Sequence, residues 1–378
     1  MTSILFVIDN LEFGGGERGF LQLIRAVAGE GWTVAVAAHP GGPFEAGVRA
    51  ACAAFVPLDM ASQLGLATVA RLRRLVRTGG FALVHSQGAR ADFFARLALL
   101  GVPRVRLVST VQMPAEGFEV GALRRAAYRA ADRLGRGRVD RFIVVSEALR
   151  RRLVEGRGLW PWQVTLVPNG VELAPPPAQA ATLRRELDLP GGARLVGAAG
   201  RLVWQKGFGN LVVAMPDVIA RVPDARLIIA GEGPLWRELE ARAGAAGVAE
   251  RVRLVGFQSD MPRFLTTLDV LVVPSVREGF PMITLEAMAL GVPIVATAID
   301  GIAEQITPDR EGLLVAPGEP AALARAIVAV LEDRALAARL GAAGRRRANE
   351  FDLRRTLAAT RRVYAELLGA PGGLASKP

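Results

Sequence analysis

Hydrophobic residues along the chain come in short runs, each about as long as one strand, with amphipathic helix-like stretches between them. In the first half these runs lie at residues 4–8, 33–38, 53–58, 82–86, 105–110, 141–146 and 164–168. In the second half they lie at residues 194–199, 226–231, 252–256, 269–275, 293–298 and 313–317. Near-continuous apolar strands that alternate with helices are typical of parallel sheets buried on both faces. The pattern therefore predicts two open α/β domains.

A proline-rich stretch, "PNGVELAPPPAQA" at residues 168–180, separates the two series of runs. Because proline cannot continue a helix or lie in a central strand, we expect one domain at residues 1–173 and a second at residues 174–352. Ligands of open parallel sheets bind outside the carboxyl ends of the strands, so two such domains are expected to face each other across a cleft. A last amphipathic helix is expected over residues 353–368, followed by a disordered tail at 369–378.

The composition narrows the class of protein. With 378 residues the chain can build two buried cores. Its apolar runs fall well short of the ~20 residues needed to cross a bilayer, and "MTSILFVIDN" has no basic leader, so a cytoplasmic protein is expected. Cys52 is the only cysteine, which excludes an internal disulfide. With His39 and His85 as the only histidines, we expect no metal site.

Most of the basic residues are arginines. The chain has 47 arginines and lysines together, and only Lys206 and Lys377 are lysines. Residues 1–173 hold 22 arginines against 14 acidic residues, so most of the net charge of +11 lies in the first half. Either an anionic partner or an arginine-rich composition explains this excess. Residues 121–138, "GALRRAAYRAADRLGRGR", suit either a helix on an anionic membrane surface or a solvated helix packed on the sheet. Low aromatic content argues against single-stranded nucleic acid as a partner.

The turn "LEFGGGERG" after the first run has the spacing of a dinucleotide fingerprint, Gly14-x-Gly16-x-x-Gly19. A nicotinamide cofactor is not expected, because the glycines do not follow the strand directly and His39-Pro40 stands where a ribose-binding acid would be. Glycines at a helix start still let backbone N–H groups approach phosphate closely. The turn therefore indicates a phosphate contact, with a tight turn that binds no ligand as the alternative.

The second domain opens in a similar way, with "LVGAAGRLVWQKGF". Gly200 and Gly207 bracket a loop at the carboxyl end of the predicted strand, and this loop presents Arg201 and Lys206. A guanidinium and an ammonium on one loop suit a diphosphate ligand. The scarcity of lysine favours a function for Lys206 over ordinary surface charge. A Schiff base to pyridoxal phosphate is the weaker alternative, since the sequence identifies no partner for the pyridinium nitrogen.

Two glutamates follow the strand "DVLVVPS" in the stretch "REGFPMITLEAMALGVPIVAT". Pro281 fits the first turn of a helix that ends near Gly291, so Glu278 is expected on the loop and Glu286 inside the helix. Two carboxylates near a helix start, at the same sheet edge as Arg201 and Lys206, indicate a binding site. The alternative is an exposed Glu278 and a Glu286 that only caps the helix or forms a salt bridge.

Five stretches occur in order along the chain: "GGGERG", "PNGVEL", "GRLVWQKGF", "GEGPLWREL" and the pair Glu278-x₇-Glu286. In this combination the sequence resembles glycosyltransferase family four over almost its entire length. The resemblance implies the GT-B fold, with two Rossmann-like doubly wound domains facing across a cleft and a C-terminal helix that packs back on the N-terminal domain. It also implies a retaining, metal-independent transferase that uses a nucleotide-sugar donor.

The resemblance implies a role for each matching residue. Arg201 and Lys206 would hold the donor diphosphate and stabilise it as it leaves. Glu278 would bind hydroxyls of the transferred sugar, and Glu286 would bind the ribose of the nucleotide. His85 matches a histidine often found near the acceptor. The other residues expected at the donor are Gly15, Gly16, Gly256, Phe257, Gly279, Phe280, Pro281 and Met282.

One position departs from the family pattern. Many members have a histidine near the reacting face of the sugar, after the fifth strand, where this sequence has Gln112 in "STVQMP". Glutamine can donate a hydrogen bond but cannot act as a base at neutral pH. Either this branch does not use that histidine, or His85 covers part of its role.

The expected activity is transfer of a hexosyl or N-acetylhexosaminyl group (EC 2.4) to a glycan or lipid-linked acceptor in bacterial-type cell-surface polysaccharide or glycolipid synthesis. A UDP-sugar is the first choice of donor and a GDP-sugar the second, with no cofactor and with peripheral association at the inner face of the cell membrane. Two rivals remain: a nucleotide-sugar epimerase of GT-B-like fold, and a non-catalytic nucleotide-sugar-binding protein.

Overall fold

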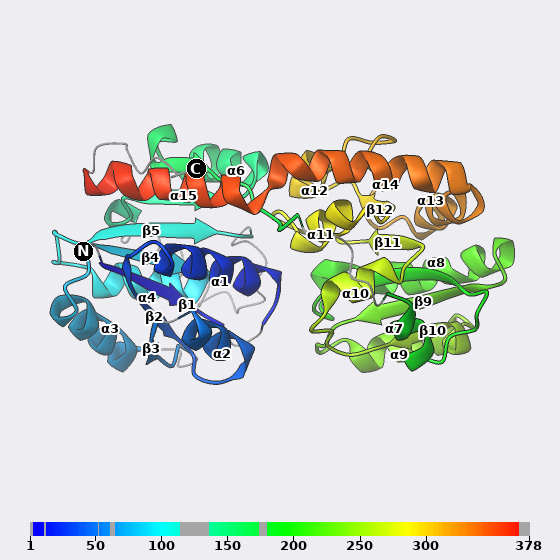
Figure 1. Cartoon of the computed structure of the whole chain (residues 1–378), viewed down its shortest axis with the longest axis horizontal. Helices are drawn as coiled ribbons and strands as arrows, with labels where there is room; N and C mark the ends of the chain where they lie inside the picture. The colour runs from blue at the N-terminus through cyan, green and yellow to red at the C-terminus, as the bar shows by residue number, and fades with distance from the viewer. Residues whose placement is uncertain are drawn as a thin grey trace. The chain divides into compact units, whose positions relative to one another are not determined.

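The computed structural model describes residues 3–10, 13–51, 53–60, 65–113, 136–173 and 180–369. The chain forms two compact units (Figure 1). Unit 1 runs through Pro168 and resumes at Arg354, and unit 2 is Asn169–Leu353. The first crossing between the units therefore lies in the proline-rich stretch, five residues before the expected boundary at 173/174.

Unit 1 is built on a parallel sheet of seven strands in the order β3-β2-β1-β4-β5-β6-β7. The strands are β1 (Ser3–Ile8), β2 (Thr33–Ala38), β3 (Ala54–Pro57), β4 (Leu83–Gln87), β5 (Arg106–Val111), β6 (Arg141–Val144) and β7 (Val164–Leu166). The helices among the described residues are α1 (Gly15–Ala28), α2 (Gly42–Ala50), α3 (Leu66–Thr78), α4 (Ala89–Ala98), α6 (Glu147–Arg157) and α15 (Leu353–Leu368).

Unit 2 contains a parallel sheet of six strands in the order β10-β9-β8-β11-β12-β13. Its strands are β8 (Arg194–Ala199), β9 (Ala225–Ala230), β10 (Val252–Leu254), β11 (Val270–Val273), β12 (Ile294–Thr297) and β13 (Leu313–Val315). Its described helices are α7 (Ala180–Glu186), α8 (Phe208–Arg221), α9 (Trp236–Ala245), α10 (Met261–Thr266), α11 (Met282–Leu290), α12 (Asp300–Gln305), α13 (Pro320–Glu332) and α14 (Arg334–Ala348). Each apolar run of the sequence has thus become a strand, and the prediction of two parallel α/β domains is confirmed.

Both sheets have the strand order of a doubly wound fold, in which the order reverses at one point. The reversal lies between β1 and β4 in unit 1 and between β8 and β11 in unit 2. The connections that follow these strands diverge, so a crevice opens outside their carboxyl ends. In unit 2 this point brings the loop after β8 next to the loop after β11.

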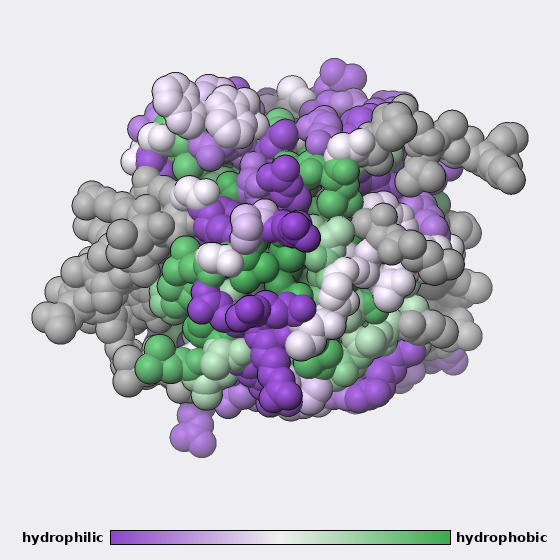
Figure 2. All heavy atoms as spheres, turned by 90° about the vertical axis from the view of Figure 1, so that its left-hand side faces the viewer, coloured by the Kyte–Doolittle hydropathy of each residue, from purple (hydrophilic) through white to green (hydrophobic). Residues whose placement is uncertain are grey.

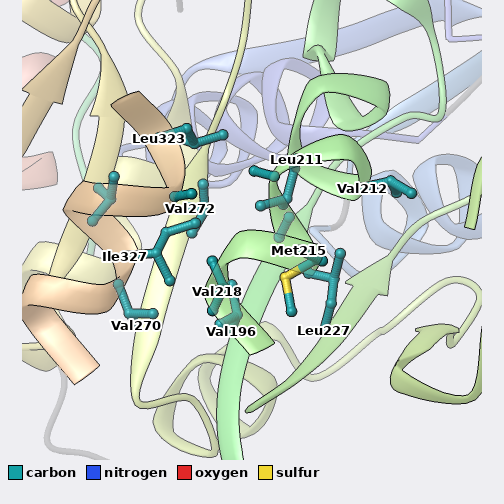
Figure 3. Close-up of a cluster of buried hydrophobic side chains, with 14 of the residues drawn as sticks. Val196, Leu211, Val212, Met215, Val218, Leu227, Val270, Val272, Leu323 and Ile327 are labelled. Atoms are coloured by element: carbon teal, nitrogen blue, oxygen red, sulfur yellow. The ribbon is translucent and has the colours of Figure 1, made fainter. Parts of the chain in front are cut away.

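The core of unit 2 lies between the sheet and two helices, α8 and α13 (Figure 3). Met215 and Val218 of α8 lie close to Val196 of β8, and Ile327 of α13 belongs to the same cluster. All four side chains are buried, and burial of an aliphatic side chain contributes about 1.5–3 kcal/mol to folding. This packing holds the start of α8, and so the loop before it, against the sheet.

The last helix, α15, belongs to unit 1, as the resemblance implied. Its buried residues Val363 and Tyr364 join a cluster with Phe20 of α1 and Phe6 of β1. A backbone hydrogen bond joins the two segments that connect the units. Val171 N–H, just after the first connection, donates to the carbonyl of Phe351, just before the second, at 2.8 Å. The closing helix is therefore part of the core of unit 1.

The surface of the described residues is mixed in character. Hydrophobic residues are interspersed with hydrophilic ones on the face that Figure 2 shows. None of the helices that the structure describes is both long enough and apolar enough to span a bilayer. The predicted basic helix at 121–138 lies outside the described residues except for 136–138, and the expected tail lies outside them from residue 370 onward.

A matched pair of substitutions tests the packing of α8. Val212 is fully buried, whereas its neighbour Val213 is 46% exposed. Val212→Ala is expected to lower the free energy of unfolding of unit 2 by about 2 kcal/mol, because it removes two carbon atoms and leaves a cavity. Val213→Ala should change it by less than about 0.5 kcal/mol. Urea titration of both variants checks this, and equal losses would contradict the placement of α8.

Candidate functional site

Two loops of unit 2 meet at the reversal of strand order. One follows β8 (residues 200–207) and the other follows β11 (residues 274–281). The carbonyl of Gln205 accepts a hydrogen bond from Val276 N–H at 2.8 Å and a second from Arg277 N–H at 3.3 Å. Gly207 has φ +65°, and a Cβ there would lie 2.0 Å from the carbonyl oxygen of Pro274. Glycine is thus needed for the two loops to lie this close.

An ion pair joins the side chains of the two loops. The ammonium Nζ of Lys206 lies 2.5 Å from Oε1 of Glu278, and Ser275 Oγ donates to the same oxygen at 2.9 Å. The Glu278 side chain is only 5% exposed and that of Lys206 is 21% exposed. A nearly buried carboxylate requires a partner, and this one has an ammonium and a hydroxyl. The structure therefore brings together two of the three residues predicted to be catalytic.

The other charged residues predicted for this site lie on the same segments. Arg201 is exposed on the loop after β8, two residues beyond the end of that strand. Glu286 is half-buried in the middle of α11. The expectation that Glu278 lies on the loop and Glu286 in the helix matches the bounds of α11.

Hydrogen bonds to its backbone carbonyls hold the turn "GFPM", residues 279–282, in place. Asn169 Nδ2 donates to the carbonyl of Phe280 at 2.9 Å, and Gln305 Nε2 donates to the carbonyl of Pro281 at 3.0 Å. A Cβ on Gly301 would lie 1.9 Å from the carbonyl oxygen of Gly279, so α12 begins directly against this turn. These contacts fix the backbone from which α11 starts.

Helices α8 and α11 both start at this edge of the sheet, immediately after the two loops. The residues at the N-cap positions, Gly207 and Pro281, provide no side-chain hydrogen bond to these helix starts. The first N–H groups of a helix have no partner inside the helix, and together with the helix dipole they favour an anion. The positive ends of two helix dipoles thus lie beside the ion pair of Lys206 and Glu278.

Glycines also allow close contacts between the loop after β8, the turn after β9 and the turn after β10. A Cβ on Gly231, which follows β9, would lie 1.9 Å from the carbonyl oxygen of Gly200. Gly231 N–H donates to the carbonyl of Gly256 at 2.8 Å. The next residue, Phe257, is 48% exposed, so its ring is available for stacking. The turn expected to contact the nucleobase is therefore linked through the backbone to the loop that carries Lys206.

Several residues that shape this site were missed by the sequence reasoning. Ser275 and Thr297 act together, since Thr297 Oγ1 donates to the carbonyl of Ser275 at 2.5 Å while Ser275 binds Glu278. Ser275 ends the run "DVLVVPS", so its position at the carboxyl end of a strand was a usable signal. Asn169 and Gln305 lie far along the chain from the turn they hold, and no local pattern marks them.

In unit 1, the glycine turn starts α1. The backbone N–H of Gly14 donates to Glu17 Oε2 at 2.9 Å, and the carbonyl of Gly16 accepts from Gln87 Nε2 at 2.9 Å. At the end of β2, the side chain of Asn10 binds both the N–H and the carbonyl of His39. The loop after β1 is thereby joined to the end of β2.

The structure corrects the placement of His85. Its side chain is fully buried, with Nδ1 2.5 Å from the hydroxyl of Tyr364 and Nε2 2.7 Å from Oγ1 of Thr110. Burial lowers the pKa of His85 to about 3, so the ring is neutral. Both ring nitrogens are engaged inside unit 1, and His85 therefore lies in the core instead of on a surface that an acceptor could reach.

The other predicted acceptor-side residue, Gln112, lies just after β5 and is half-buried. Its Nε2 donates to Oε1 of Gln87 at 3.2 Å. Among the described residues, no group of three or more side chains of the types that bind metals lies close enough to hold a metal ion.

Comparison with solved structures supports the fold assignment. The chain is similar over 97% of its length to all of the crystallised chain of HepE from Anabaena in complex with UDP-glucose, with a TM-score of 0.84 and 21% sequence identity. Two parallel-sheet units of this strand order, with a C-terminal helix returned to the first unit, form the GT-B fold.

Sequence comparison then gives the family. The model "Glycosyltransferase Family 4" matches residues 13–174, and the model "Glycosyl transferases group 1" matches residues 179–347. A GDP-mannose-dependent alpha-(1-6)-phosphatidylinositol monomannoside mannosyltransferase of Mycobacterium tuberculosis is 33% identical over 290 residues, 73% of each chain. The chain belongs to the group 1, family 4 glycosyltransferases.

A second relative matches a shorter stretch. The 2-deoxystreptamine glucosyltransferase of Streptomyces kanamyceticus is 32% identical over 206 residues. This match spans 53% of the chain and 53% of that relative. The two relatives differ in the sugar that their names state, so membership of the family does not fix the sugar.

The buried imidazole gives a prediction about pH. Unfolding frees His85 to titrate near its ordinary pKa of 6.5, whereas in the folded protein the pKa is about 3. The unfolded state therefore binds more protons between these values, and stability should fall as the pH drops below 6.5. From pH 7.5 to pH 5.0 this group should remove about 2 kcal/mol of stability.

Urea titration at the two pH values measures this effect in wild type and in two variants. His85→Phe should be less stable than wild type at pH 7.5 but should lose about 2 kcal/mol less on acidification, since the titrating group is gone. Val36→Ala, a buried apolar substitution in the same cluster that leaves the imidazole in place, is the matched control and should keep the wild-type pH dependence. An unchanged pH dependence in His85→Phe would contradict the buried placement.

Proposed function

We propose that the protein is a retaining, metal-independent glycosyltransferase that moves a hexosyl or N-acetylhexosaminyl group from a nucleoside diphosphate sugar to a glycan or lipid-linked acceptor. The observation that carries the proposal is the ion pair of Lys206 and Glu278 at the point in unit 2 where the strand order reverses. The starts of α8 and α11 flank it.

The cations of the loop after β8 would bind the donor diphosphate. An ammonium has three N–H donors, and Glu278 accepts one from Lys206, so the others would be donated to phosphate oxygens. Arg201 on the same loop would add a planar guanidinium, and the first N–H groups of α8 and α11 would add backbone donors. Negative charge grows on the diphosphate as the sugar leaves, so these groups would stabilise the transition state more than the bound donor.

Glu278 would hold both the lysine and the sugar. Its Oε1 accepts from Lys206 and Ser275, which fixes the orientation of the carboxylate. Its Oε2 would then accept hydrogen bonds from hydroxyls of the transferred sugar. A carboxylate aligned by two donors before the substrate arrives needs little reorganisation during the reaction.

The reaction would proceed through an oxocarbenium-like state on one face of the sugar. The bond from the anomeric carbon to the diphosphate oxygen would break as the bond to the acceptor oxygen forms on the same face. The acceptor proton would pass to the departing diphosphate, so the step needs no protein nucleophile. A nucleotide-sugar epimerase would instead need acid and base groups beside the sugar, and incubation of the donor alone followed by a search for an epimer separates the two reactions.

A UDP-sugar is the first choice of donor and a GDP-sugar the second. The name of the mycobacterial relative states GDP-mannose, and HepE was crystallised with UDP-glucose. The exposed ring of Phe257 next to Gly256 would contact the nucleobase, and either base offers a face for stacking. Glu286 would accept from the ribose hydroxyls.

The acceptor and the location of the protein are proposed from charge and from the same relative. The name of the mycobacterial enzyme states a lipid acceptor, a phosphatidylinositol mannoside. The first half of the chain carries most of the net positive charge, which suits an anionic membrane surface at the inner face of the cell membrane. Sedimentation with anionic liposomes at low salt tests this location, and protein that stays in the supernatant would count against it.

Removal of the lysine ammonium tests its role at the leaving group. Lys206→Ala is expected to lower kcat by about 10²–10³, comparable to the loss of one oxyanion-stabilising donor. Lys206→Arg should retain more activity than Lys206→Ala, because it keeps the charge but changes its geometry. Lys377→Ala, at the only other lysine, is the matched control and should be unaffected. Steady-state kinetics, with melting temperatures to exclude unfolding, checks this, and a fully active Lys206→Ala would remove the residue from the mechanism.

A thermal-shift panel of UDP-, GDP- and ADP-sugars in the presence of EDTA tests donor class and metal independence together. A donor at 100 times its Kd should stabilise the protein by about 2.7 kcal/mol, whereas a nucleotide that is not recognised should give no shift. UDP-sugars are expected to give the largest shift. Shifts that appear only when a divalent cation replaces EDTA would contradict metal independence.

A further inference from the structure

Two pairs of hydrogen-bonded polar side chains join adjacent strands of unit 1, β4 and β5. His85 and Gln87 are two residues apart on β4, so they point to the same face of the sheet. Strands β4 and β5 are parallel neighbours, with Gln87 opposite Thr110. Gln112 follows Thr110 by two positions. The four side chains form a short polar ladder that reaches the carboxyl end of the sheet.

The first pair of the ladder connects the sheet to α15. His85 bridges Thr110 Oγ1 and the hydroxyl of Tyr364, which is itself fully buried. A neutral imidazole has one N–H donor and one acceptor nitrogen, so one hydroxyl donates to the ring and the other accepts from it. This pair anchors the strand ends to the closing helix.

The second pair connects the sheet to the glycine turn. Gln87 is 4% exposed, and its Nε2 donates to the carbonyl of Gly16. Because that carbonyl can only accept, the orientation of the Gln87 amide is fixed, with Oε1 toward Gln112. The Nε2 of Gln112 donates a hydrogen bond to this Oε1. Each amide therefore sets the orientation of the next.

We propose that Gln87 and Gln112 are positioning residues that act as one carboxamide clamp on the glycine turn. Gly14, Gly15 and Gly16 have more backbone freedom than other residues, and a turn of three glycines needs external contacts to hold one conformation. Glu17 holds the turn at Gly14, and the clamp holds it at Gly16. The clamp thereby fixes the first N–H groups of α1 for their ligand.

This inference rests on the proposed function, together with the expectation from the sequence that Gly15 and Gly16 lie at the donor. It gives Gln112 a role that differs from acid–base chemistry. A carboxamide presents a donor and an acceptor at every pH. It can therefore accept a hydrogen bond from the β5 side and donate one toward the turn, and it carries no charge.

Leucine substitutions test whether the two amides act as a unit. Gln87→Leu and Gln112→Leu should each lower kcat/KM about tenfold, and the double variant should be no worse than the poorer single variant. Gln163→Leu, in the turn Pro161–Gln163 of the same unit, is the matched control and should leave kcat/KM unchanged. Wild-type kcat/KM in both single variants, or strictly multiplicative losses in the double variant, would overturn the clamp.

A charge substitution gives a readout that loss of stability alone would not produce. In Gln112→Glu, an ionised carboxylate cannot donate to Oε1 of Gln87, whereas the protonated acid can. The ratio of the variant's kcat/KM to that of wild type should therefore rise as the pH falls through the pKa of the new carboxyl group. Gln163→Glu should keep a constant ratio. A ratio that does not change with pH in Gln112→Glu would overturn the proposed direction of the hydrogen bonds.

Hydrogen exchange separates failure of the clamp from failure of the proposed function, because it needs no turnover. The amides of residues 18–20 in α1 should exchange at least tenfold faster in Gln87→Leu than in wild type, while those of β4 and α15 keep their protection. If wild type transfers no sugar, the transferase proposal fails and the exchange rates still test the clamp. Unchanged exchange at residues 18–20 would overturn it.

Discussion

The buried ion pair between Lys206 and Glu278 is the interaction on which the architecture of unit 2 converges. A carboxylate enclosed to this degree is stable only with its partners in place, and those partners come from the loops after β8 and β11. The two loops meet where the strand order reverses, because β8 and β11 are neighbours there and the connections that follow them diverge. The fold thus brings one positive and one negative group together at the edge where ligands of this fold bind.

Close backbone contacts explain why the site is rich in glycine. At four places a side chain would overlap a neighbouring carbonyl oxygen: Gly207 against Pro274, Gly231 against Gly200, Gly233 against Leu202, and Gly301 against Gly279. These contacts pack four turns into a continuous backbone surface. Amides and carbonyls held in this way are already oriented before a ligand binds, which lowers the cost of ordering them.

The strands and the residues at their ends could be predicted from the sequence, because both depend on local patterns. Apolar runs marked the strands, and Lys206 and Glu278 follow strands at a recognisable spacing. The contacts of Asn169 and Gln305 could not be predicted, because each depends on which distant backbone carbonyl the folded chain places nearby. His85 shows the converse limit: it follows the same pattern as a residue at a strand end, but its burial depends on α15, which is 279 residues away from it at Tyr364.

The return of α15 to unit 1 also sets the order in which the protein can fold. Unit 2 is continuous in sequence, so all of it leaves the ribosome before α15 does. The core of unit 1 cannot be completed until Tyr364 is synthesised, because α15 covers Phe20 and His85. The second half of the chain therefore folds as an insertion within an unfinished first half, and the last helix acts as the step that closes unit 1.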